Sequence, residues 1–383
     1  MIDKLVLFPY YISLKIRHAL YNKGIKKSRR GAIPTVCVGN ITVGGTGKTP
    51  HTEMILKALL RSDDWGMKEI SVLSRGYKRS SRGFQQVTKE DGAGFSGDEP
   101  AQIKSNFPGL TIAVCKDRLE GLDFLAHPET LASSKKGRKC IHKDFRPADV
   151  AVLDDALQYR ALCPDFSVLL VDYNRPIYKD SLMPIGRLRD LPERICAADS
   201  LIVTKCPVVL EDWERTEWLK PLGIGDFDTD TCIGTLPGGK KISVFFTSIN
   251  YRPLKPVFPE EADNRYSYSS RAILFSGIAK DTPLRRYLSD SFKIVRHFRF
   301  ADHHRFSKGD IHSLMSASEA APTAALITTE KDAQRIKDCK KIPSKLKERL
   351  FFIPIEVAFL SENEQAVFEK TMLDALRAFT PEP

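Results

Sequence analysis

One stretch of the sequence, residues 35–52 (TVCVGNITVGGTGKTPHT), constrains the fold of this chain more than any other. An apolar run at 36–38 ends at Gly39, a glycine-rich loop follows, and a helical pattern begins after Lys48 and Thr49. Strand, glycine-rich loop and helix are the context in which a P-loop motif binds phosphate. Glycines let backbone N–H groups turn towards phosphate oxygens, and the helix N-terminus adds its positive end.

The glycine-rich loop is predicted to hold the phosphates of a nucleotide. Lys48 is expected to reach the β- and γ-phosphates, and the Thr49 hydroxyl to bind Mg²⁺. Thr42 stands at the first glycine of the usual G-x-x-x-x-G-K-[ST] spacing, so a purely structural turn is the alternative interpretation. Such a turn would not also supply Lys-Thr at a helix start. The predicted nucleotide-binding residues are Thr42, Val43, Gly44, Gly45, Thr46, Gly47, Lys48 and Thr49.

The alternation of apolar runs with helical patterns predicts an α/β fold. Apolar runs near residues 36, 70, 111, 150, 168 and 201 alternate with helical segments, which indicates a doubly wound, mostly parallel sheet of the P-loop NTPase type. A second, smaller α/β unit begins near residue 272, and 351–359 is expected to pair with 241–248 as a two-stranded link. The predicted divisions are an N-terminal amphipathic segment (1–30), the P-loop core (31–240), a smaller C-terminal α/β domain (241–359) and a terminal helix packed on the core (360–383).

Composition restricts the class of partner and the compartment. The chain has 383 residues and a formal net charge of +11, which favours an anionic partner such as a nucleotide, an anionic membrane, an acidic lipid or a nucleic acid. Its eight cysteines are scattered, with no C-x-x-C pair. That pattern favours a reducing compartment and argues against a disulfide framework or a structural metal.

The first 30 residues combine apolar and basic side chains. The segment is too short and too charged to span a bilayer, it lacks a signal-peptide cleavage pattern, and Pro9 is expected to kink any helix. An amphipathic segment followed by a cluster of lysines and arginines suits an anionic membrane surface. The alternative is a first helix packed on the core with a solvated basic end, and both interpretations can hold together.

Charged residues at strand ends are candidates for the site. Arg75 and Lys78 follow the apolar run at 70–73, so we expect them at the carboxyl edge of the sheet, where ligands of open α/β folds bind. The alternative interpretation is a basic surface loop. Asp154 and Asp155 end another buried run, which is typical of the acidic half of a P-loop site that binds a metal or water. Asp98 precedes Glu-Pro and is open to two interpretations: a helix N-cap or a carboxylate near the nucleotide.

A histidine pair lies in the second unit, at His303 and His304. No third or fourth ligand stands at a supporting spacing, so a metal site is not indicated there. Asp302 is placed to set a tautomer or a pKa of its neighbour.

Taken in order, the motifs resemble those of a known family. VGN-ITVGGTGKTP, LSRGY, GDEP, LDDALQ, VD-RP, IVTK, FSGIA, F-ADHHRF and TTEKD follow one another as in tetraacyldisaccharide 4'-kinases, the lipid A kinases of Gram-negative bacteria. The resemblance covers nearly the whole chain and is weakest over 120–145 and 210–270. Thr42 at the first glycine position is normal for that family.

The resemblance implies a function. It predicts an ATP- and Mg²⁺-dependent kinase that transfers the γ-phosphate to the 4'-hydroxyl of a tetraacyl disaccharide 1-phosphate in lipid A biosynthesis. The enzyme would be peripheral, at the cytoplasmic face of the bacterial inner membrane, with the lipid substrate and an anionic membrane surface as partners. We expect a monomer. We also expect no nucleic-acid partner, because the chain lacks an aromatic-basic strand of the RNP type.

The resemblance also implies roles for individual residues. Asp98 of GDEP would take the proton from the attacking hydroxyl, and His303, preferred over His304, would orient it. Closure of the two domains on nucleotide binding follows from this arrangement. One departure concerns 178–181, which reads YKDS where the family is often rich in Asn and Gly. The implied site comprises catalytic Asp98, His303, Lys48 and Arg75; metal ligands Thr49, Asp154 and Asp155; and substrate contacts Tyr77, Glu99, Arg187 and Arg189.

The rival interpretation is a nucleotide-driven switch acting on a protein partner. The paired glycines also resemble the deviant P-loops of partitioning and targeting ATPases and GTPases. A guanine-reading loop needs an acid two residues after the lysine of Thr204-Lys205, but Cys206 and Pro207 follow. The signature lysine of the deviant class is replaced by Val43. Both absences favour a kinase that uses ATP.

Overall fold

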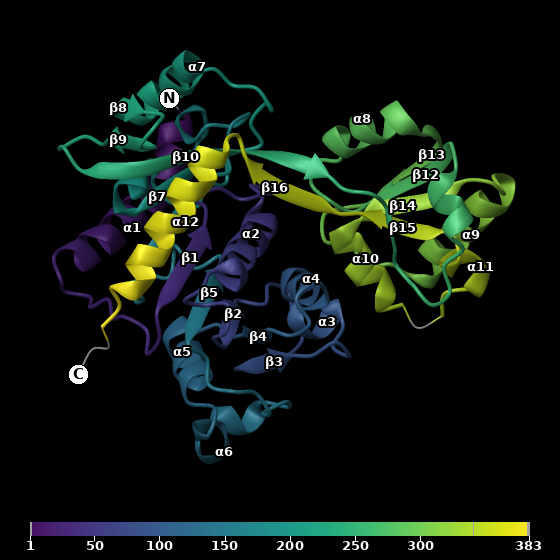
Figure 1. The fold of residues 1–383 in the computed structure, drawn as a ribbon, viewed down its shortest axis with the longest axis horizontal. Helices are drawn as coiled ribbons and strands as arrows, with labels where there is room; N and C mark the ends of the chain where they lie inside the picture. Colours follow the sequence, from purple (N-terminus) through teal and green to yellow (C-terminus); the bar gives the residue numbers. More distant parts are fainter. Residues whose placement is uncertain (1, 340, 381–383) are drawn as a thin grey trace.

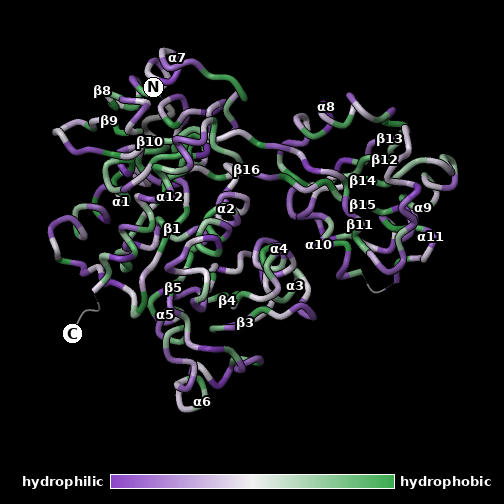
Figure 2. Tube along the Cα trace, viewed as in Figure 1, coloured by the Kyte–Doolittle hydropathy of each residue, from purple (hydrophilic) through white to green (hydrophobic). Residues whose placement is uncertain are grey.

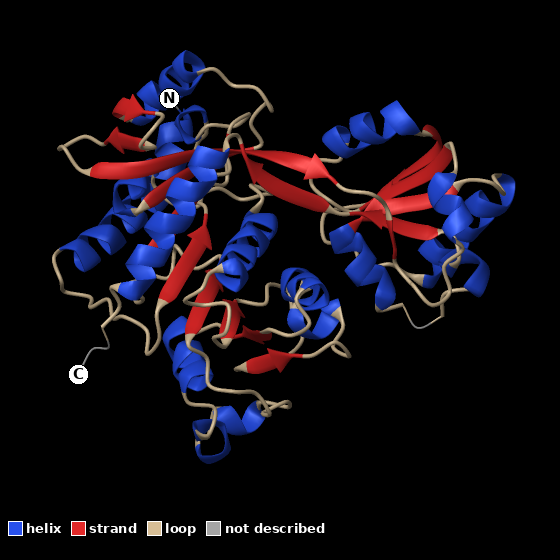
Figure 3. Cartoon of the chain, in the orientation of Figure 1, coloured by secondary structure: helices blue, strands red, loops and turns tan. Residues whose placement is uncertain are grey.

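The P-loop strand β1 (Thr35–Gly39) lies in the middle of a large, mostly parallel sheet (Figure 1). The computed structural model describes residues 2–339 and 341–380, with the side chains of the first helix described from Leu7 onwards. The predicted domain limits at residue 1 and at 381–383 lie outside the described residues. A second, smaller sheet forms a separate lobe, and two antiparallel strands join the lobes (Figure 3). The predicted α/β architecture with a smaller second domain is therefore confirmed.

The large sheet has the order β3-β4-β2-β5-β1-β6-β7-β10-β9-β8, and β16 pairs with β10. Neighbours from β4 to β10 run parallel, whereas β3, β9, β8 and β16 pair antiparallel with their neighbours. Its remaining strands are β2 (Ile70–Ser74), β3 (Gln85–Val87), β4 (Thr111–Val114), β5 (Val150–Asp154), β6 (Phe166–Asp172), β7 (Ser200–Thr204), β8 (Gly225–Asp228), β9 (Ile233–Thr235), β10 (Lys241–Tyr251) and β16 (Ile355–Phe359).

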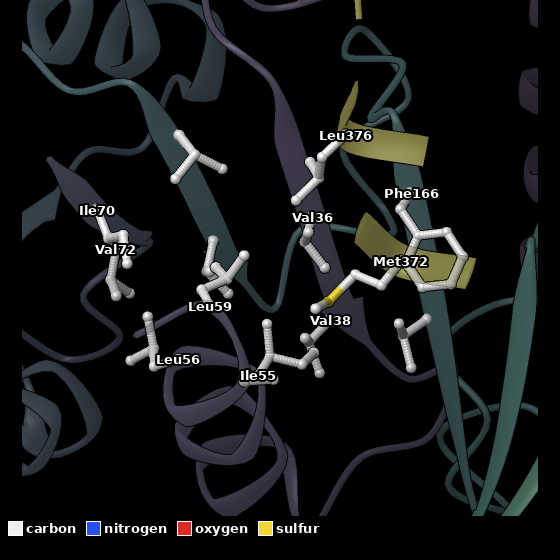
Figure 4. Close-up of a cluster of buried hydrophobic side chains, with 14 of the residues drawn as sticks. Val36, Val38, Ile55, Leu56, Leu59, Ile70, Val72, Phe166, Met372 and Leu376 are labelled. Carbon is white, nitrogen blue, oxygen red and sulfur yellow. The ribbon is translucent and has the colours of Figure 1, made fainter. Parts of the chain in front are cut away.

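Helices cover both faces of the large sheet. Apolar side chains of α2 and α12 pack on one face; Figure 4 shows Ile55 and Leu59 of α2 and Met372 of α12 against Val38 and Phe166 of the strands. The opposite face is covered by α1, α5 and α7. The helices of this lobe are α1 (Ile2–Asn22), α2 (Lys48–Arg61), α3 (Ala93–Ser96), α4 (Asp98–Asn106), α5 (Arg118–Ala126), α6 (Thr130–Ser133), α7 (Asp212–Leu219) and α12 (Glu362–Arg377).

The small sheet has the order β11-β15-β14-β12-β13 and is also covered on both faces. Helix α8 packs on one face, and α9, α10 and α11 pack on the other. Figure 2 shows hydrophobic residues concentrated along the strands of both lobes. The elements are β11 (Lys255–Pro256), β12 (Arg271–Ser276), α8 (Thr282–Ser291), β13 (Lys293–Arg299), α9 (Lys308–Ala320), β14 (Ala325–Thr329), α10 (Glu330–Lys337), α11 (Ser344–Lys347) and β15 (Leu350–Ile353).

The link between the lobes differs from the predicted one. Pro354 divides the run 351–359, so β15 joins the small sheet and only β16 pairs with β10, at residues 247–251. Residues 243–246 of β10 pair with β7 instead, so the large sheet extends past the predicted boundary at 241. A single long strand thus belongs first to the core sheet and then to the link, which an apolar pattern alone does not reveal.

One local prediction at a helix is settled and another is not tested. Helix α1 continues through Pro9, which is exposed, so the proline does not end the helix, and the kink expected there stays a prediction. Asp98 is not an N-cap: Gly97, with a φ of 99°, takes that place, and Asp98 opens the first turn of α4. None of the helices in the described parts of the chain combines the length and the apolar character needed to cross a membrane.

Candidate active site

The P-loop has the conformation of a phosphate cradle. Gly44 (φ 111°) and Gly47 (φ 89°) adopt backbone angles that L side chains rarely reach, and Gly47 caps the N-terminus of α2. The Asn40 amide donates to the Thr46 hydroxyl at 2.6 Å and holds the loop from within. These contacts leave the loop open on the side of the helix N-terminus, where an anion is favoured.

Two consecutive residues at the end of β7 hold the P-loop from outside. The Thr204 hydroxyl donates to the Thr46 carbonyl at 3.0 Å, and the Lys205 ammonium donates to the Gly45 carbonyl. Asp172 accepts from Lys205 at 2.6 Å and fixes the ammonium. Because both carbonyls are directed towards β7, the loop is pre-organised for phosphate.

The residues predicted to bind metal come from two neighbouring elements: Thr49 lies in the first turn of α2, which follows β1, and Asp154 and Asp155 end β5. The Thr49 hydroxyl is buried and has no hydrogen-bond partner in the described residues. Asp154 is fully buried, and its closest hydroxyls, from Ser74 and Thr52, are 3.4 and 3.5 Å away. Burial, then the charges of Glu99 and Asp155, raises the pKa of Asp154. An orphaned hydroxyl beside a poorly solvated carboxylate fits a hard divalent cation.

Asp155 has a different environment from its neighbour. Its φ of 53° turns the side chain away from the strand direction. Both of its oxygens accept from Arg189, and the Lys48 ammonium is 3.8 Å away. Burial opposes ionisation, but Lys48 and Arg189 outweigh it and lower the pKa of Asp155. Asp155, predicted as a metal ligand, is thus satisfied by Arg189, predicted as a substrate contact.

The two lobes meet at Asp98. Its Oδ2 lies 2.9 Å from His303 Nδ1, and it accepts from Arg335 Nε at 2.8 Å and from Arg335 Nη2 at 2.6 Å. Burial raises the pKa of Asp98, but the hydrogen bonds of His303 and Arg335 outweigh it and lower the pKa to about 2. Asp98 is therefore ionised throughout the physiological range.

The two histidines point to different partners. His303, with a φ of 61°, faces Asp98 and packs edge-on against the Tyr77 ring at 5.6 Å. His304 lies 2.9 Å from Asp310 and stacks on Phe300 at 4.6 Å, within its own domain. Of the two histidines, His303 is the one that contacts the P-loop domain among the described residues, through Asp98 and Tyr77.

Other predicted site residues lie near this contact, and they differ in the hydrogen bonds that they make. Glu99 accepts from Lys331 at 2.7 Å, and Lys331, with a further contribution from Lys48, lowers its pKa. Arg75 is exposed and has no hydrogen bond or ion pair within the described part of the chain. Arg187 meets the P-loop through its carbonyl, which accepts from the Val43 N–H at 2.7 Å.

A pocket of about 250 Å³ opens beside Asp98, between the lobes. Residues of the core and of the C-terminal domain both line this pocket. They include aromatic, basic and acidic side chains. A hydroxyl-bearing ring that enters it would meet Asp98. Its lining includes Tyr77, Lys78, Asp98, His303, Arg305 and Arg335.

A buried carboxyl pair forms another contact between the domains. Glu53 of α2 and Glu330 of α10 share the amides of Gln102 and Asn106, at 2.9 to 3.1 Å. Burial, then the charge of Glu330, raises the pKa of Glu53 to about 8, and burial raises the pKa of Glu330. The oxygen of Gln102 is buried without a partner among the described residues, so a proton on one carboxyl fits this site.

We expect Glu53→Gln to stabilise the protein above pH 8. The folded-state pKa of Glu53 is about 8 against an ordinary 4.5, so its contribution to stability is full below pH 4.5 and is lost as pH rises through about 8. Glutamine keeps the neutral form, with a gain on the order of 2 kcal/mol at pH 9. Melting temperatures from pH 5 to 9 measure this. The control is Glu260→Gln at an exposed position. A Glu53→Gln effect that does not change with pH would contradict the assignment.

Sequence reasoning missed Arg335 and Lys331, which contact Asp98 and Glu99. A signal was present: Thr329 caps α10 through the Asp332 N–H, directly after a buried strand. Residues four apart on such a helix share a face. Basic residues at 331 and 335 therefore project together from the carboxyl edge of the second sheet.

Comparisons with known proteins identify the family of the chain. The family described as Tetraacyldisaccharide-1-P 4'-kinase (LpxK) matches residues 5–377. The chain belongs to this family. Among its relatives are two proteins named "Tetraacyldisaccharide 4'-kinase". The one from Parabacteroides distasonis is 34% identical over 365 residues, with 94% of this chain and 90% of the relative covered. The one from Phocaeicola vulgatus is 33% identical over 379 residues, with 97% and 94% covered.

A solved structure shares the fold. LpxK from Aquifex aeolicus, in a crystal structure of the "apo" form in complex with ATP, superposes with a TM-score of 0.66. The match covers 98% of this chain and all of that one, at 23% identity. The two-lobed arrangement is thus that of a known member of the family.

Proposed function

We propose that this protein transfers the γ-phosphate of ATP to the 4'-hydroxyl of a tetraacyl disaccharide 1-phosphate, a step of lipid A biosynthesis. Membership of the family supports this reaction class. The observation that carries the proposal in the structure is the contact of Asp98 with His303 across the domain interface, 2.9 Å between Oδ2 and Nδ1. A carboxylate oriented by an imidazole, beside a P-loop, is suited to receive a proton from an alcohol.

In the proposed reaction, the 4'-hydroxyl oxygen forms a bond to the γ-phosphorus while the bond to the β–γ bridging oxygen breaks and ADP leaves. The hydroxyl proton passes to Asp98. A pKa of about 2 makes Asp98 a weak base. That is adequate because phosphoryl transfer has a loose transition state in which the hydroxyl proton is lost late, so positioning matters more than basicity.

Thr49 and Asp154 would hold Mg²⁺. The unpartnered Thr49 hydroxyl and the buried Asp154 carboxylate support this assignment. When bound, the ion would neutralise negative charge on the phosphates. Lys48 contributes a positive charge between Asp155 and the P-loop, 3.5 Å from the Asn40 oxygen. Its ammonium can therefore bind phosphate oxygens without moving far.

The experiment that tests the function is phosphate transfer from labelled ATP in mixed micelles. The acceptors are a tetraacyl disaccharide 1-phosphate, a soluble sugar and water. We expect label on the lipid alone. Hydrolysis of ATP without lipid phosphorylation, stimulated by a protein partner, would instead support a nucleotide-driven switch.

We infer further that the protein is peripheral and acts at the anionic cytoplasmic face of the inner membrane. Helix α1 packs on the core through Leu14 and His18, yet its other face exposes Phe8 (59%) and Ile16 (55%). The exposed basic residues of 23–30 follow directly. Apolar and basic residues side by side suit an anionic bilayer surface. We also infer a monomer without a nucleic-acid partner, which sedimentation with and without RNA would test.

Replacing both Phe8 and Ile16 by aspartate should weaken vesicle binding roughly tenfold, because two apolar contacts are lost and two negative charges are added. Co-sedimentation with vesicles of phosphatidylglycerol and phosphatidylethanolamine measures it. Met67→Asp, at a side chain 96% exposed elsewhere, is the matched control. Equal loss in the control and the double variant would refute a specific role for α1.

A further inference from the structure

Arg335 lies at the point where the C-terminal domain meets the reacting carboxylate. Its side chain is 4% exposed. Two of its nitrogens, Nε at 2.8 Å and Nη2 at 2.6 Å, donate to the same oxygen of Asp98, Oδ2. A buried charge-assisted pair of this kind is strong and geometrically specific.

The guanidinium of Arg335 is also fixed from behind, by its own domain. Its Nη1 donates to the Gly277 carbonyl at 2.8 Å and to Asp332 Oδ1 at 2.7 Å. Asp332 is fully buried, and its Oδ2 accepts from the Gly277 N–H at 2.9 Å and from the Thr329 hydroxyl at 2.7 Å. The C-terminal domain therefore sets the orientation of Arg335 independently of Asp98.

The contacts of Asp98 are asymmetric. Arg335 and His303 both contact Oδ2, at 2.6 to 2.9 Å. Oδ1 has no hydrogen-bond partner in the described residues. Asp98 lines the pocket of about 250 Å³ between the lobes. One oxygen is thus held, and the other is left for a ligand that enters the pocket.

We propose that Arg335 is a positioning residue for the transfer: with His303 it holds Oδ2 of Asp98 and so leaves Oδ1 to receive the proton of the acceptor hydroxyl. The inference rests on the proposed kinase function. Because Arg335 and His303 come from one domain and Asp98 from the other, the base is assembled only when the two domains are in contact. Closure and proton acceptance are thereby coupled through Arg335 and His303.

Arg335 also controls the protonation of Asp98. Its contacts are among the main causes that hold the pKa of Asp98 at about 2 against the effect of burial. Loss of its charge leaves burial less opposed, so the pKa rises. The other charged and titratable groups that line the pocket with Asp98 are His303, Tyr77, Lys78, Arg305, Asp338 and Cys339.

The test compares Arg335→Gln and Arg335→Lys with the wild type in the lipid transfer assay. For Arg335→Gln we expect kcat to fall roughly 100-fold, with the KM for ATP within about threefold. A new acid limb should appear in its pH profile, because Asp98 then becomes protonated at a higher pH. Arg335→Lys keeps the positive charge but loses the two guanidinium donors that hold Asp98. Its kcat should fall roughly tenfold, and its pH profile should show no new acid limb.

Two controls separate positioning from folding. Arg349→Gln removes another arginine of the same domain, which donates to Ser318 and Tyr266, and should leave the pH profile unchanged. Adding Arg335→Gln to Asp98→Asn should cost less than about threefold more, because Arg335 acts through Asp98. Additive losses, or an Arg335→Gln variant with an unchanged pH profile, would overturn the inference. A wild type that does not phosphorylate the lipid would instead refute the proposed function.

Discussion

Replacement of Asp98 by asparagine should lower kcat for lipid phosphorylation by roughly 1,000-fold while ATP affinity stays nearly unchanged. Asparagine keeps the shape of the side chain, but its amide cannot take up the hydroxyl proton. The P-loop contacts of Asn40, Thr204 and Lys205 do not involve Asp98, so the nucleotide site remains intact. The loss should therefore appear in turnover.

Asp98→Asn should also reduce stability, because Arg335 then keeps a buried charge with one carboxylate fewer. Asp332 still pairs with it at 2.7 Å, so we expect a modest cost, on the order of 2 kcal/mol. Single-turnover transfer at saturating ATP and equilibrium binding of labelled ATP measure the two effects separately. Asp290→Asn changes an exposed carboxylate on helix α8 and serves as the control, with turnover expected to stay at the wild-type value. Turnover above about a tenth of the wild-type value in Asp98→Asn would exclude Asp98 as the proton acceptor.

The architecture was predictable because it depends on local patterns. Six buried runs specify a parallel sheet, and the loop before Lys48 identifies which strand carries the phosphate site. The predicted alternation with helices is wrong in one half of the sheet, because no helix separates β5 from β6 and only short 3-10 turns separate β6 from β7. The predicted α/β class and the family are both confirmed. The split role of β10 was not predictable, because one continuous apolar run gives no sign of where its partner changes from β7 to β16.

The contacts across the domain interface were harder to predict than the motifs that supply them. Asp98 and Arg335 are 237 positions apart, and the sequence around either residue does not predict the other as its partner. The contact between Glu53 and Glu330 was equally hard to predict. In the sequence, each glutamate has the pattern of an ordinary residue on a helix surface. The packing of α2, α4 and α10 shows that both are buried. Charge in a sequence does not reveal burial when the covering element comes from another domain.

Replacement of Lys48 by methionine should abolish lipid phosphorylation, with a loss of roughly 1,000-fold or more. The ammonium is the positive charge of the P-loop, close to three acidic side chains. It lies 3.8 Å from Asp155 and helps to lower the pKa of Asp155 and, after Lys331, that of Glu99. At Asp154 its charge only partly offsets the burial that raises the pKa. Methionine fills the same space without charge. Phosphate oxygens would then meet these carboxylates without compensation, so ATP binding should weaken along with turnover.

A matched comparison within helix α2 separates the charge of Lys48 from general damage to the helix. Lys57 lies on the same helix and pairs with Glu356, away from the P-loop. Lys57→Met should keep transfer within about threefold of the wild type, since a partly exposed pair of this kind contributes little. The transition state spreads charge over the γ-phosphate oxygens. The fall in the rate of phosphate transfer in Lys48→Met should therefore be larger than the fall in its affinity for ATP. If the two losses are equal, Lys48 binds ATP in the ground state only, and charge stabilisation during transfer must come from other groups.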